Sequence, residues 1–593
     1  MSRKPKLELT WIGKDERPRL EPRILIEDTA KSYHASAKRE GDIFDNMLIH
    51  GDNLLALKAL QSDERVKGKV KCVYIDPPFN TQQALPNYDD GIEHSLWLSL
   101  IRDRLEILRE LLSEDGTLFV HIDDNEIAYL TAVLDQIFGR ENRISIITFK
   151  QGAATGHKAI NPGVVSTSNF ILLYAREKAK WKPNKVFVGR VDRDKRYNQF
   201  IQNVESASAD WQFTTLMKAF AQSLELPERG LKKRFGKEFE TKIIEFVHAN
   251  ARAVTRTARP DYDSVSSAAQ EMIDNSTRFP REILKLKRDG ELSDMYFKNG
   301  ERILFYSDKL KFVDGQYVAG EPLTTIWDDI LSNNLHNEGG VEFPKSKKPE
   351  ALIKRCLDLA TVRNDLVLDS FAGSGTTGAV AHKMGRRWVM VELAEHANTH
   401  ITPRMRRVVD GSDKSGVTDA SSWKGGGGFR FYNLAPSLLE VDKWGRWVIS
   451  KEYNAAMLAE AMCKHMGFTY APAQDKTEYW RHGHSSERDF IYVTTLSLTH
   501  DQLRAISEDV GPDRTLLICC KAFNARTDDF DNLTVNKIPH TVLSRCEWGN
   551  DDYSLNIAKL PERGPDTAPE PETKSPARKA KPAMPSLFDG EED

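Results

Sequence analysis

The sequence predicts an α/β fold: a parallel sheet interrupted by a polar insertion and followed by a second α/β module. Three observations predict it. Short apolar runs alternate with amphipathic helical patterns over residues 46–180, the same alternation returns over 341–424, and the stretch between them is polar. Strands that alternate with helices are typical of a parallel sheet with crossover helices. The two α/β blocks are therefore predicted to form one domain that the insertion splits.

The first block is predicted to run strand, helix, strand. Residues 70–75 and 117–122 are apolar runs of strand length, and residues 96–112 between them have a helical period. The second block repeats this order. Residues 366–369 are predicted to be a strand that enters a Gly-rich turn, residues 378–384 a helix, and residues 388–392 the next strand.

The remaining segments differ in composition. Residues 1–45 are charged and are predicted to form an N-terminal arm, and residues 181–340 combine basic clusters with scattered aromatic residues. The glycine run 425–428 is predicted to be a flexible joint that opens a C-terminal module over 425–560. Residues 561–593 are rich in Pro, Lys, Ala and Glu, so this tail is predicted to be disordered.

Composition describes an ordinary soluble chain. The sequence shows no apolar run long enough to span a membrane, and its charged N-terminus is not followed by a signal-like segment, so a cytoplasmic location is expected. Six cysteines lack zinc-binding spacing and are expected to be reduced and buried, as in the run 515–520. The net charge of −3 excludes a generally basic surface, although positive charge is concentrated in the insertion.

The first motif that carries chemistry is the Gly-rich turn 369–377, DSFAGSGTT. Gly373 and Gly375 would let a ligand approach the backbone at the start of a helix. Glu392 ends the next predicted strand, a place that suits hydrogen bonding to ribose hydroxyls. The alternative is a nicotinamide or flavin site, which the missing third glycine makes a poorer fit, and a P-loop is not supported.

The second motif is Asp76-Pro77-Pro78-Phe79, directly after the strand 70–75. Two prolines fix the backbone, so a carboxylate, a rigid carbonyl and an aromatic ring are presented together. Such a set can hold a planar group that bears an amine, and the alternative is a strand-ending turn with a buried Phe. Because open α/β sheets bind ligands at the carboxyl ends of their strands, both motifs are expected at one edge.

Together the two motifs resemble those of DNA amino-methyltransferases. The catalytic motif precedes the cofactor motif, which resembles the beta group and, within it, the modification subunits of type III restriction systems. Other stretches that carry the resemblance are residues 49–57 (IHGDNLLAL), 97–105 (WLSLIRDRL) and 343–350 (FPKSKKPE). The resemblance implies a Rossmann-like S-adenosylmethionine-dependent methyltransferase fold, with 181–340 as a target-recognition region.

The resemblance also implies residue roles. Asp76 and the carbonyl of Pro77 would accept hydrogen bonds from the target amine, beside Pro78, and Phe79 would stack on the flipped base, where most relatives carry Tyr. The implied cofactor-binding residues are Asp52, Lys348, Pro349, Asp369, Phe371, Gly373, Gly375, Thr376 and Glu392. Among them, Lys348-Pro349 would close over the methionine end, Glu392 would bind the ribose and Asp52 the adenine.

The expected activity is therefore transfer of a methyl group from S-adenosylmethionine to N6 of adenine in duplex DNA, without a metal. Cytosine-N4 methylation is the alternative within the class, although Asp at the first motif position favours adenine. A scaffold that has lost catalysis is the alternative outside it. Expected partners are a restriction subunit with helicase and nuclease activity and a second copy of the chain. Residues 121–126 (HIDDNE) are predicted to cap a helix through Asp123 or Asp124, with a metal cluster as the alternative.

Overall fold

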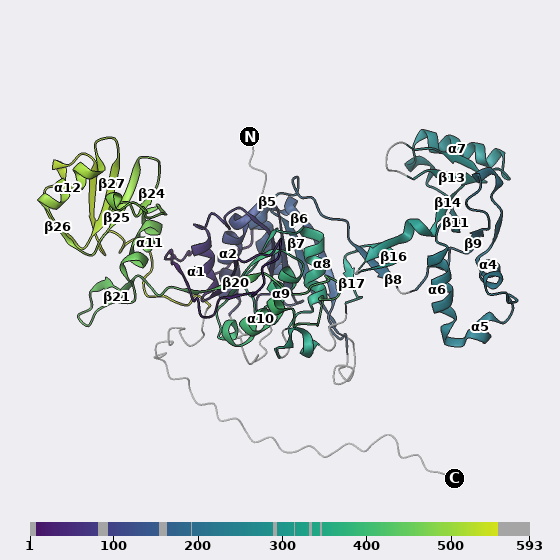
Figure 1. The fold of residues 1–593 in the computed structure, drawn as a ribbon, viewed down its shortest axis with the longest axis horizontal. Helices are drawn as coiled ribbons and strands as arrows, with labels where there is room; N and C mark the ends of the chain where they lie inside the picture. The colour runs from purple at the N-terminus through teal and green to yellow at the C-terminus, as the bar shows by residue number, and fades with distance from the viewer. Residues whose placement is uncertain are drawn as a thin grey trace, which may run out of the picture. The chain divides into compact units, whose positions relative to one another are not determined.

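The computed structural model of this chain describes residues 8–80, 93–152, 163–190, 192–288, 293–313, 315–330, 335–343 and 347–554. A central 11-stranded sheet organises the described part of the chain (Figure 1). Its strands are β1 (Leu25–Glu27), β2 (Tyr33–His34), β3 (Asn46–His50), β4 (Val70–Ile75), β5 (Leu112–Ile122), β6 (Arg143–Lys150), β7 (Ser168–Ala175), β17 (Ile326–Trp327), β18 (Leu366–Asp369), β19 (Arg387–Glu392) and β20 (Gly428–Leu434).

The order of the strands is β1-β20-β3-β19-β18-β4-β5-β7-β6-β17, and β2 pairs with β20. From β20 to β5 all neighbours are parallel, whereas β7 runs antiparallel to both β5 and β6. The chain winds from β18 to β19 on one side and from β4 to β5 on the other. The boundary between β18 and β4 is therefore a topological switch point, where open α/β sheets bind ligands.

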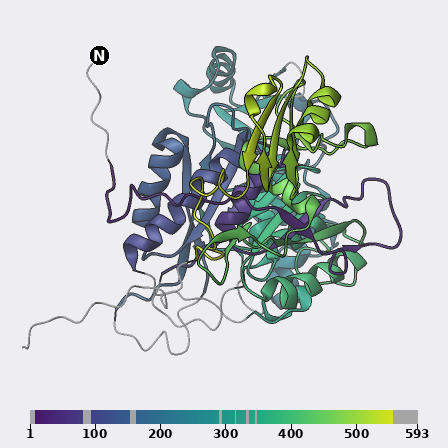
Figure 2. The same ribbon diagram turned by 90° about the vertical axis from the view of Figure 1, so that its left-hand side faces the viewer.

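Two groups of helices cover this sheet and lie on opposite sides of it (Figure 2). One group is α1 (Asn53–Leu60), α2 (His94–Leu111) and α3 (Ile127–Leu134), and the other is α8 (Glu350–Ala360), α9 (Thr376–Lys383) and α10 (Thr402–Asp410). In α2, Trp97, Ile101, Leu105 and Leu108 recur at helical spacing and are buried, which explains why this segment folds as an amphipathic helix.

The sequence prediction for these elements is confirmed. Strands 70–75 and 366–369 have the predicted bounds, and the strand predicted at 388–392 starts one residue earlier. The helix predicted at 96–112 is α2, and the helix predicted at 378–384 is α9. Strand β5 begins earlier than the predicted residue 117, at Leu112, because it pairs with Val70 through an irregular register.

The insertion has its own hydrophobic core, with Phe220, Ile243, Val247 and Tyr306 among its buried residues. Its strands form a six-stranded antiparallel sheet and a three-stranded sheet. The elements are β8 (Phe187–Arg190), β9 (Gln199–Ile201), β10 (Phe213–Thr215), α4 (Leu216–Ser223), α5 (Leu231–Phe235), α6 (Phe239–Ala249), β11 (Val254–Ala258), α7 (Ser267–Arg278), β12 (Leu284–Leu286), β13 (Met295–Lys298), β14 (Glu301–Phe305), β15 (Leu310–Val313) and β16 (Gln316–Pro322). Strand β17 then rejoins the central sheet beside β6, ahead of residue 341.

The C-terminal module is a second α/β unit, with a five-stranded sheet of order β23-β24-β25-β27-β29. Its elements are β21 (Leu439–Val441), β22 (Trp447–Ile449), α11 (Ala455–Met466), β23 (Thr469–Tyr470), β24 (Gly483–His484), β25 (Asp489–Val493), β26 (Ser497–Thr499), α12 (His500–Val510), β27 (Thr515–Cys520), β28 (Ala522–Asn524) and β29 (Leu533–Lys537). The apolar run 515–520 is the buried strand that the sequence predicts, and all six cysteines are buried and free.

The glycine run 425–428 is a tight entry into the central sheet, whereas the sequence predicts a flexible joint. Strand β20 begins at Gly428 and pairs with β3, so the separate module starts after Leu434. Gly427 is buried with φ of 70°, and a Cβ there would lie 2.6 Å from the carbonyl oxygen of Ile43. The glycines are needed because the chain passes through a crowded space. The predicted N-terminal arm likewise joins the sheet, through β1 and β2.

The predicted disordered tail, 561–593, lies outside the described residues. Within those that are described, no helix is both long and apolar enough to cross a membrane.

Candidate active site

The two predicted motifs lie at the carboxyl ends of neighbouring strands. Strand β4 ends at Ile75 and leads into Asp76, while β18 ends at Asp369 and leads into the Gly-rich turn. The strands are parallel, with Val73 paired to Leu368, so their carboxyl ends coincide. The structure thus brings the Asp-Pro-Pro-Phe motif and the Gly-rich turn together at the switch point.

The turn after β4 is held by helix α2 and by Glu126. The indole Nε1 of Trp97, which is fully buried, donates a 2.9 Å hydrogen bond to the carbonyl oxygen of Pro78. Asn80 has φ of 57° and donates from Nδ2 to Oε1 of Glu126 at 2.9 Å. His94 contacts the same Glu126 oxygen at 3.0 Å. These hydrogen bonds hold the backbone of the turn in place, so the positions of Asp76 and Phe79 are fixed.

The ring of Phe79 stacks on His121, which lies near the end of strand β5. The ring centroids are 5.7 Å apart and the rings are inclined by 26°. The imidazole is fully buried between the hydroxyl of Tyr74, at 2.9 Å, and the side-chain amide of Asn169, at 3.1 Å. Burial, followed by the charge of Lys348, holds the pKa of His121 well below its usual value. His121 is therefore a neutral platform under the ring of Phe79.

The helix after His121 starts later than the sequence predicts. The N-cap of α3 is Glu126, which makes no capping hydrogen bond, so neither Asp123 nor Asp124 caps the helix. Asp123 accepts hydrogen bonds from the backbone and side chain of Asn125, which turns the chain before the helix begins. No group of three or more potential metal ligands gathers here or elsewhere in the described ranges.

Lys348 contacts two residues of the Asp-Pro-Pro-Phe motif. Its Nζ lies 2.5 Å from Oδ2 of Asp76 and 5.0 Å from the ring centroid of Phe79. The side chains of Lys348 and Asp76 are 11% and 19% exposed, so the ion pair is largely shielded from water. Pro349 is the N-cap of α8, which places Lys348 immediately before that helix.

The Gly-rich turn leaves β18 and enters α9 through two left-handed glycines. Gly373 has φ of 52° and Gly375, the N-cap of α9, has φ of 75°. A Cβ on Gly375 would lie 2.8 Å from Ile401, whereas a Cβ on Gly373 would meet its nearest atoms at 3.9 Å. Gly375 is therefore required for packing against the protein, whereas a Cβ on Gly373 would make only ordinary van der Waals contact, so Gly373 is favoured there by its left-handed backbone.

Two carboxylates hold this turn. Asp369 accepts hydrogen bonds from the backbone N of Phe371, at 2.9 Å, and from the hydroxyl of Thr377, at 2.6 Å. Glu392, at the end of β19, accepts from the backbone N of Gly373 at 2.7 Å. Burial raises the pKa of Asp369 to about 7; the two hydrogen bonds oppose the rise, and the charges of Asp76 and Glu392 add to it.

Buried charges that the sequence reasoning missed support the same turn. Arg404 of α10 is fully buried; it donates to the carbonyl oxygen of Ser374 at 3.1 Å and to the hydroxyl of Thr376 at 2.9 Å. Nη2 of Arg404 donates to Oε1 of Glu350 at 2.7 Å, and Nζ of Lys383 donates to Oε2 of Glu350 at 2.8 Å. The charge pattern of α8, α9 and α10 gives no signal for this network, because each charge looks like a surface residue until the helices pack.

Asp52, predicted to bind the adenine of the cofactor, is 1% exposed and already has protein partners. Oδ1 caps helix α1 by accepting from the backbone N of Leu55 at 3.0 Å. Oδ2 accepts from the backbone N of Tyr553 at 3.0 Å and lies 3.5 Å from Arg104. An adenine-binding role for Asp52 stays a prediction, and the structure shows that it also anchors the chain near residue 553.

The residues of the Gly-rich turn fit the cofactor that the resemblance implies. The hydroxyl of Ser370 is buried and has no hydrogen-bond partner among the described residues, so it can bond to a ligand. Beside it are the uncrowded backbone of Gly373, the half-buried ring of Phe371 and the carboxylate of Glu392. These groups provide the apolar wall, the hydroxyl and the acceptor that a nucleoside with an amino-acid chain needs.

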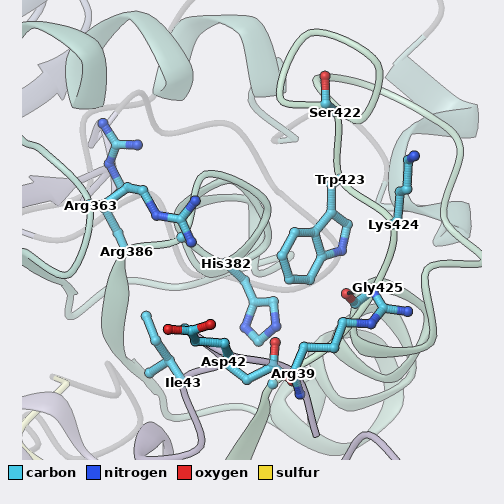
Figure 3. Close-up of a pocket in the computed structure, with 14 residues that line it drawn as sticks. Arg39, Asp42, Ile43, Arg363, His382, Arg386, Ser422, Trp423, Lys424 and Gly425 are labelled. Atoms are coloured by element: carbon cyan, nitrogen blue, oxygen red, sulfur yellow. Dashed lines mark hydrogen bonds between the residues drawn. The ribbon is translucent and has the colours of Figure 1, made fainter. Parts of the chain in front are cut away.

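A separate cavity of 250 Å³ opens at the opposite, amino edge of the strands. Figure 3 shows Arg363 and Arg386 on one side of it and Arg39 and Lys424 on the other, with His382 between them. His382 accepts at Nδ1 from the indole of Trp388, which can only donate, and therefore donates from Nε2 to the carbonyl oxygen of Gly426. This cavity is remote from both motifs and takes no part in the site described above.

The strand order and the two turns at one switch point define a Rossmann-like methyltransferase fold, as the sequence predicts. The sequence matches the DNA methylase family over residues 70–402. The chain therefore belongs to the DNA methylase family.

Its relatives include subunits of type III restriction-modification enzymes. The HindVI Mod subunit of Haemophilus influenzae is 33% identical over 422 residues, which cover 67% of this chain and 55% of that relative. The EcoP15I Mod subunit of Escherichia coli is 25% identical over 504 residues, which cover 74% of this chain and 73% of that relative. This chain thus spans about half the length of the first of these relatives.

Solved structures to which the chain is similar include a DNA modification methylase from Thermus thermophilus, at 14% identity and a TM-score of 0.29. The match covers 65% of this chain and 99% of that one. The PvuII DNA methyltransferase, described as cytosine-N4-specific, is 12% identical with a TM-score of 0.29, covering 65% of this chain and 95% of that one.

Proposed function

We propose that this protein is an S-adenosylmethionine-dependent methyltransferase that modifies N6 of adenine in duplex DNA, as the modification subunit of a type III-like restriction system. One observation carries the proposal: the carboxylate of Asp76 and the ring of Phe79 lie one strand away from the Gly-rich turn, at the switch point. The Mod subunits among its relatives support the type III assignment.

The Gly-rich turn is the proposed cofactor site. Phe371, Gly373, Gly375 and Thr376 would line it, with Glu392 as acceptor for the ribose hydroxyls. S-adenosylmethionine supplies the methyl group when bound. Asp369 and Arg404 hold the turn from inside the protein, so its shape is set before any ligand enters, which reduces the ordering cost of binding.

Asp76 and Phe79 would bind and orient the target base. An aromatic amine is a poor nucleophile because its lone pair is delocalised into the ring. Hydrogen bonds from its N–H groups to Asp76 and to the carbonyl of Pro77 favour a more tetrahedral nitrogen and free that lone pair for in-line attack. The ring of Phe79 would stack on the flipped base, and His121 supports that ring from behind.

The insertion is the proposed target-recognition region, and it presents cations beside aromatic rings. Lys298 lies 4.3 Å from the ring centroid of Phe213, and the guanidinium of Arg256 lies 5.3 Å from that of Tyr197. Cations positioned in this way suit contacts with phosphates and bases. A restriction subunit and a second copy of this chain are the proposed protein partners, and the cytoplasm is the proposed location.

Transfer of labelled methyl from S-adenosylmethionine to mixed-sequence duplex DNA, followed by nucleoside analysis, tests this function. The expected product is N6-methyl-2′-deoxyadenosine, whereas N4-methyl-2′-deoxycytidine would keep the mechanism and overturn the base assignment. Asp76→Ala should abolish transfer while cofactor binding and DNA binding persist. The control is Asp63→Ala, which removes a carboxylate that pairs with Arg65 away from the site. Full activity in Asp76→Ala would sink the proposal.

A further inference from the structure

The ammonium of Lys348 lies where the proposed function places the amine of the target base. Its Nζ is 2.5 Å from Oδ2 of Asp76 and 5.0 Å from the ring centroid of Phe79. The target amine needs the same carboxylate, and the target ring needs the same face of Phe79. We propose, on the basis of the function proposed above, that Lys348 is an internal stand-in for the target amine, which must withdraw before a flipped base can enter.

The chemistry of the ammonium matches that of the amine it replaces. A lysine ammonium has three N–H donors and no acceptor, so it satisfies a carboxylate as an amine does. It is also attracted to the face of an aromatic ring, so Phe79 contributes to holding it. Because Asp76 is 19% exposed, the ammonium further supplies a counter-charge to a shielded carboxylate in the base-free enzyme.

The backbone on both sides of Lys348 is fixed. Lys347 points into the protein, where its Nζ donates to the carbonyl oxygen of Val341 at 2.9 Å and to that of Glu338. Glu350 is fully buried; its carboxylate contacts Arg404 and Lys383, and its backbone N donates to the side chain of Glu338 at 3.0 Å. Withdrawal is therefore a movement of the Lys348 side chain alone, whose flexible four-carbon stem allows it.

A base can bind only to the fraction of protein in which Lys348 has left the site. The apparent affinity for the base is therefore the intrinsic affinity multiplied by that fraction. Removal of the ammonium should therefore favour base entry without any new contact to DNA. The direction of the change in DNA affinity identifies this role. If Lys348 were structural or contacted DNA directly, its removal would weaken DNA binding.

The experiment uses duplexes that carry 2-aminopurine at the target adenine, placed by mapping the methylated positions. Fluorescence at saturating full-length protein reports the flipped fraction, and titration reports Kd. Lys348→Met should raise the flipped fraction and tighten binding by about fivefold to tenfold. Lys348→Arg keeps a cation beside Asp76, so its flipped fraction should stay close to that of the wild type. Lys71→Met is the matched control, because Lys71 forms a 2.5 Å ion pair with Asp115 outside the site.

A second variant pair tests whether the effect acts through Asp76. In an Asp76→Asn background the ammonium has lost its charged partner, so Lys348→Met should no longer change the flipped fraction. If Lys348→Met unfolds at a clearly lower temperature than the wild type, Lys348→Gln is used in its place. Unchanged or weaker flipping in folded Lys348→Met or Lys348→Gln would overturn the stand-in role even if methylation depends on Asp76. Full methylation by Asp76→Ala would instead overturn the proposed function itself.

Discussion

The backbone N of Tyr553 donates a 3.0 Å hydrogen bond to Oδ2 of Asp52, across 501 residues of sequence. The same carboxylate caps α1 and lies 3.5 Å from the guanidinium of Arg104, which in turn donates to the carbonyl oxygen of Tyr553. One side chain thus joins the start of α1, helix α2 and the last described segment of the chain. The last described segment of the chain is thereby attached at the carboxyl end of strand β3.

Asp52→Asn should therefore lower the stability of the whole protein. The asparagine amide keeps one oxygen that can cap α1, but its NH2 group would face the backbone N–H of Tyr553, which is itself a donor. The substitution also removes the negative charge beside buried Arg104. We expect the free energy of unfolding, measured in urea, to fall by about 1–3 kcal/mol. Asp63→Asn is the control, since Asp63 pairs with the more exposed Arg65. An equal fall in both variants would show that Asp52 has no special anchoring role.

Arg404→Lys should weaken cofactor binding while the protein stays folded. Lysine keeps the charge beside Glu350 but lacks the planar fork that also reaches Ser374 and Thr376. We expect the Kd for S-adenosylmethionine, measured by calorimetry, to rise about tenfold, as for the loss of one hydrogen bond to a charged group. Arg406→Lys on the same helix, where the side chain lies over Tyr33, should leave Kd unchanged.

Acid should destabilise the C-terminal module through His465. Burial, helped by the charges of Arg545 and Arg23, lowers the pKa of His465 to about 3. The unfolded chain binds the proton more readily, so the stability contributed by the neutral ring is present above about pH 6.5 and is lost as pH falls toward 3. The loss should approach about 1.4 kcal/mol per pH unit, and it appears as a lower urea midpoint at pH 5 than at pH 7.5.

His465→Phe tests the source of this pH dependence. The ring packs beside Trp548, with centroids 5.1 Å apart, so phenylalanine preserves the contact and removes the titrating nitrogens. The difference in the free energy of unfolding between pH 7.5 and pH 5 should shrink by the contribution of one proton that only the unfolded chain binds. His484→Phe, on an exposed edge of the same module, controls for the added ring. A difference that is unchanged in His465→Phe would assign the acid effect to other groups.

Thiol titration should find the six cysteines unreactive in the folded protein. All six are buried and free, and burial raises the pKa of each of them, including Cys72, Cys356 and Cys463. Dithionitrobenzoate should therefore react with less than one thiol per chain in native buffer and with six after denaturation without reductant. Fewer than six in the denatured chain would reveal a disulfide.

The sequence predicts the fold and the motif turns well because the information is local. An apolar run that ends in Asp76-Pro77-Pro78-Phe79, or in the turn before Thr376, specifies both a strand and the turn after it. The bounds of β4, β18 and β27 could be predicted for this reason, since each run is bordered by turn residues or charges.

Contacts between distant segments could not be predicted from the sequence. The resemblance predicts Lys348 at the methionine end of the cofactor, yet its ammonium pairs with Asp76. Asp369 and Thr376 lie in the predicted turn, but their side chains bond to the protein itself, and sequence spacing gives no orientation. The glycines 425–427 look like a linker until Ile43 and Asp42 are seen to crowd them.

Strand β3 pairs with β19 and β20, and β4 pairs with β18, so the early strands of the sheet wait for partners that are synthesised only after the insertion. A nascent chain that has emerged only through the insertion holds Asp76 on a strand with an open edge, and such edges attract other strands. Premature termination anywhere before β20 therefore leaves β3 without one of its two parallel neighbours. What remains is an incomplete sheet with unpaired strand edges, a species of the kind that chaperones and proteases remove.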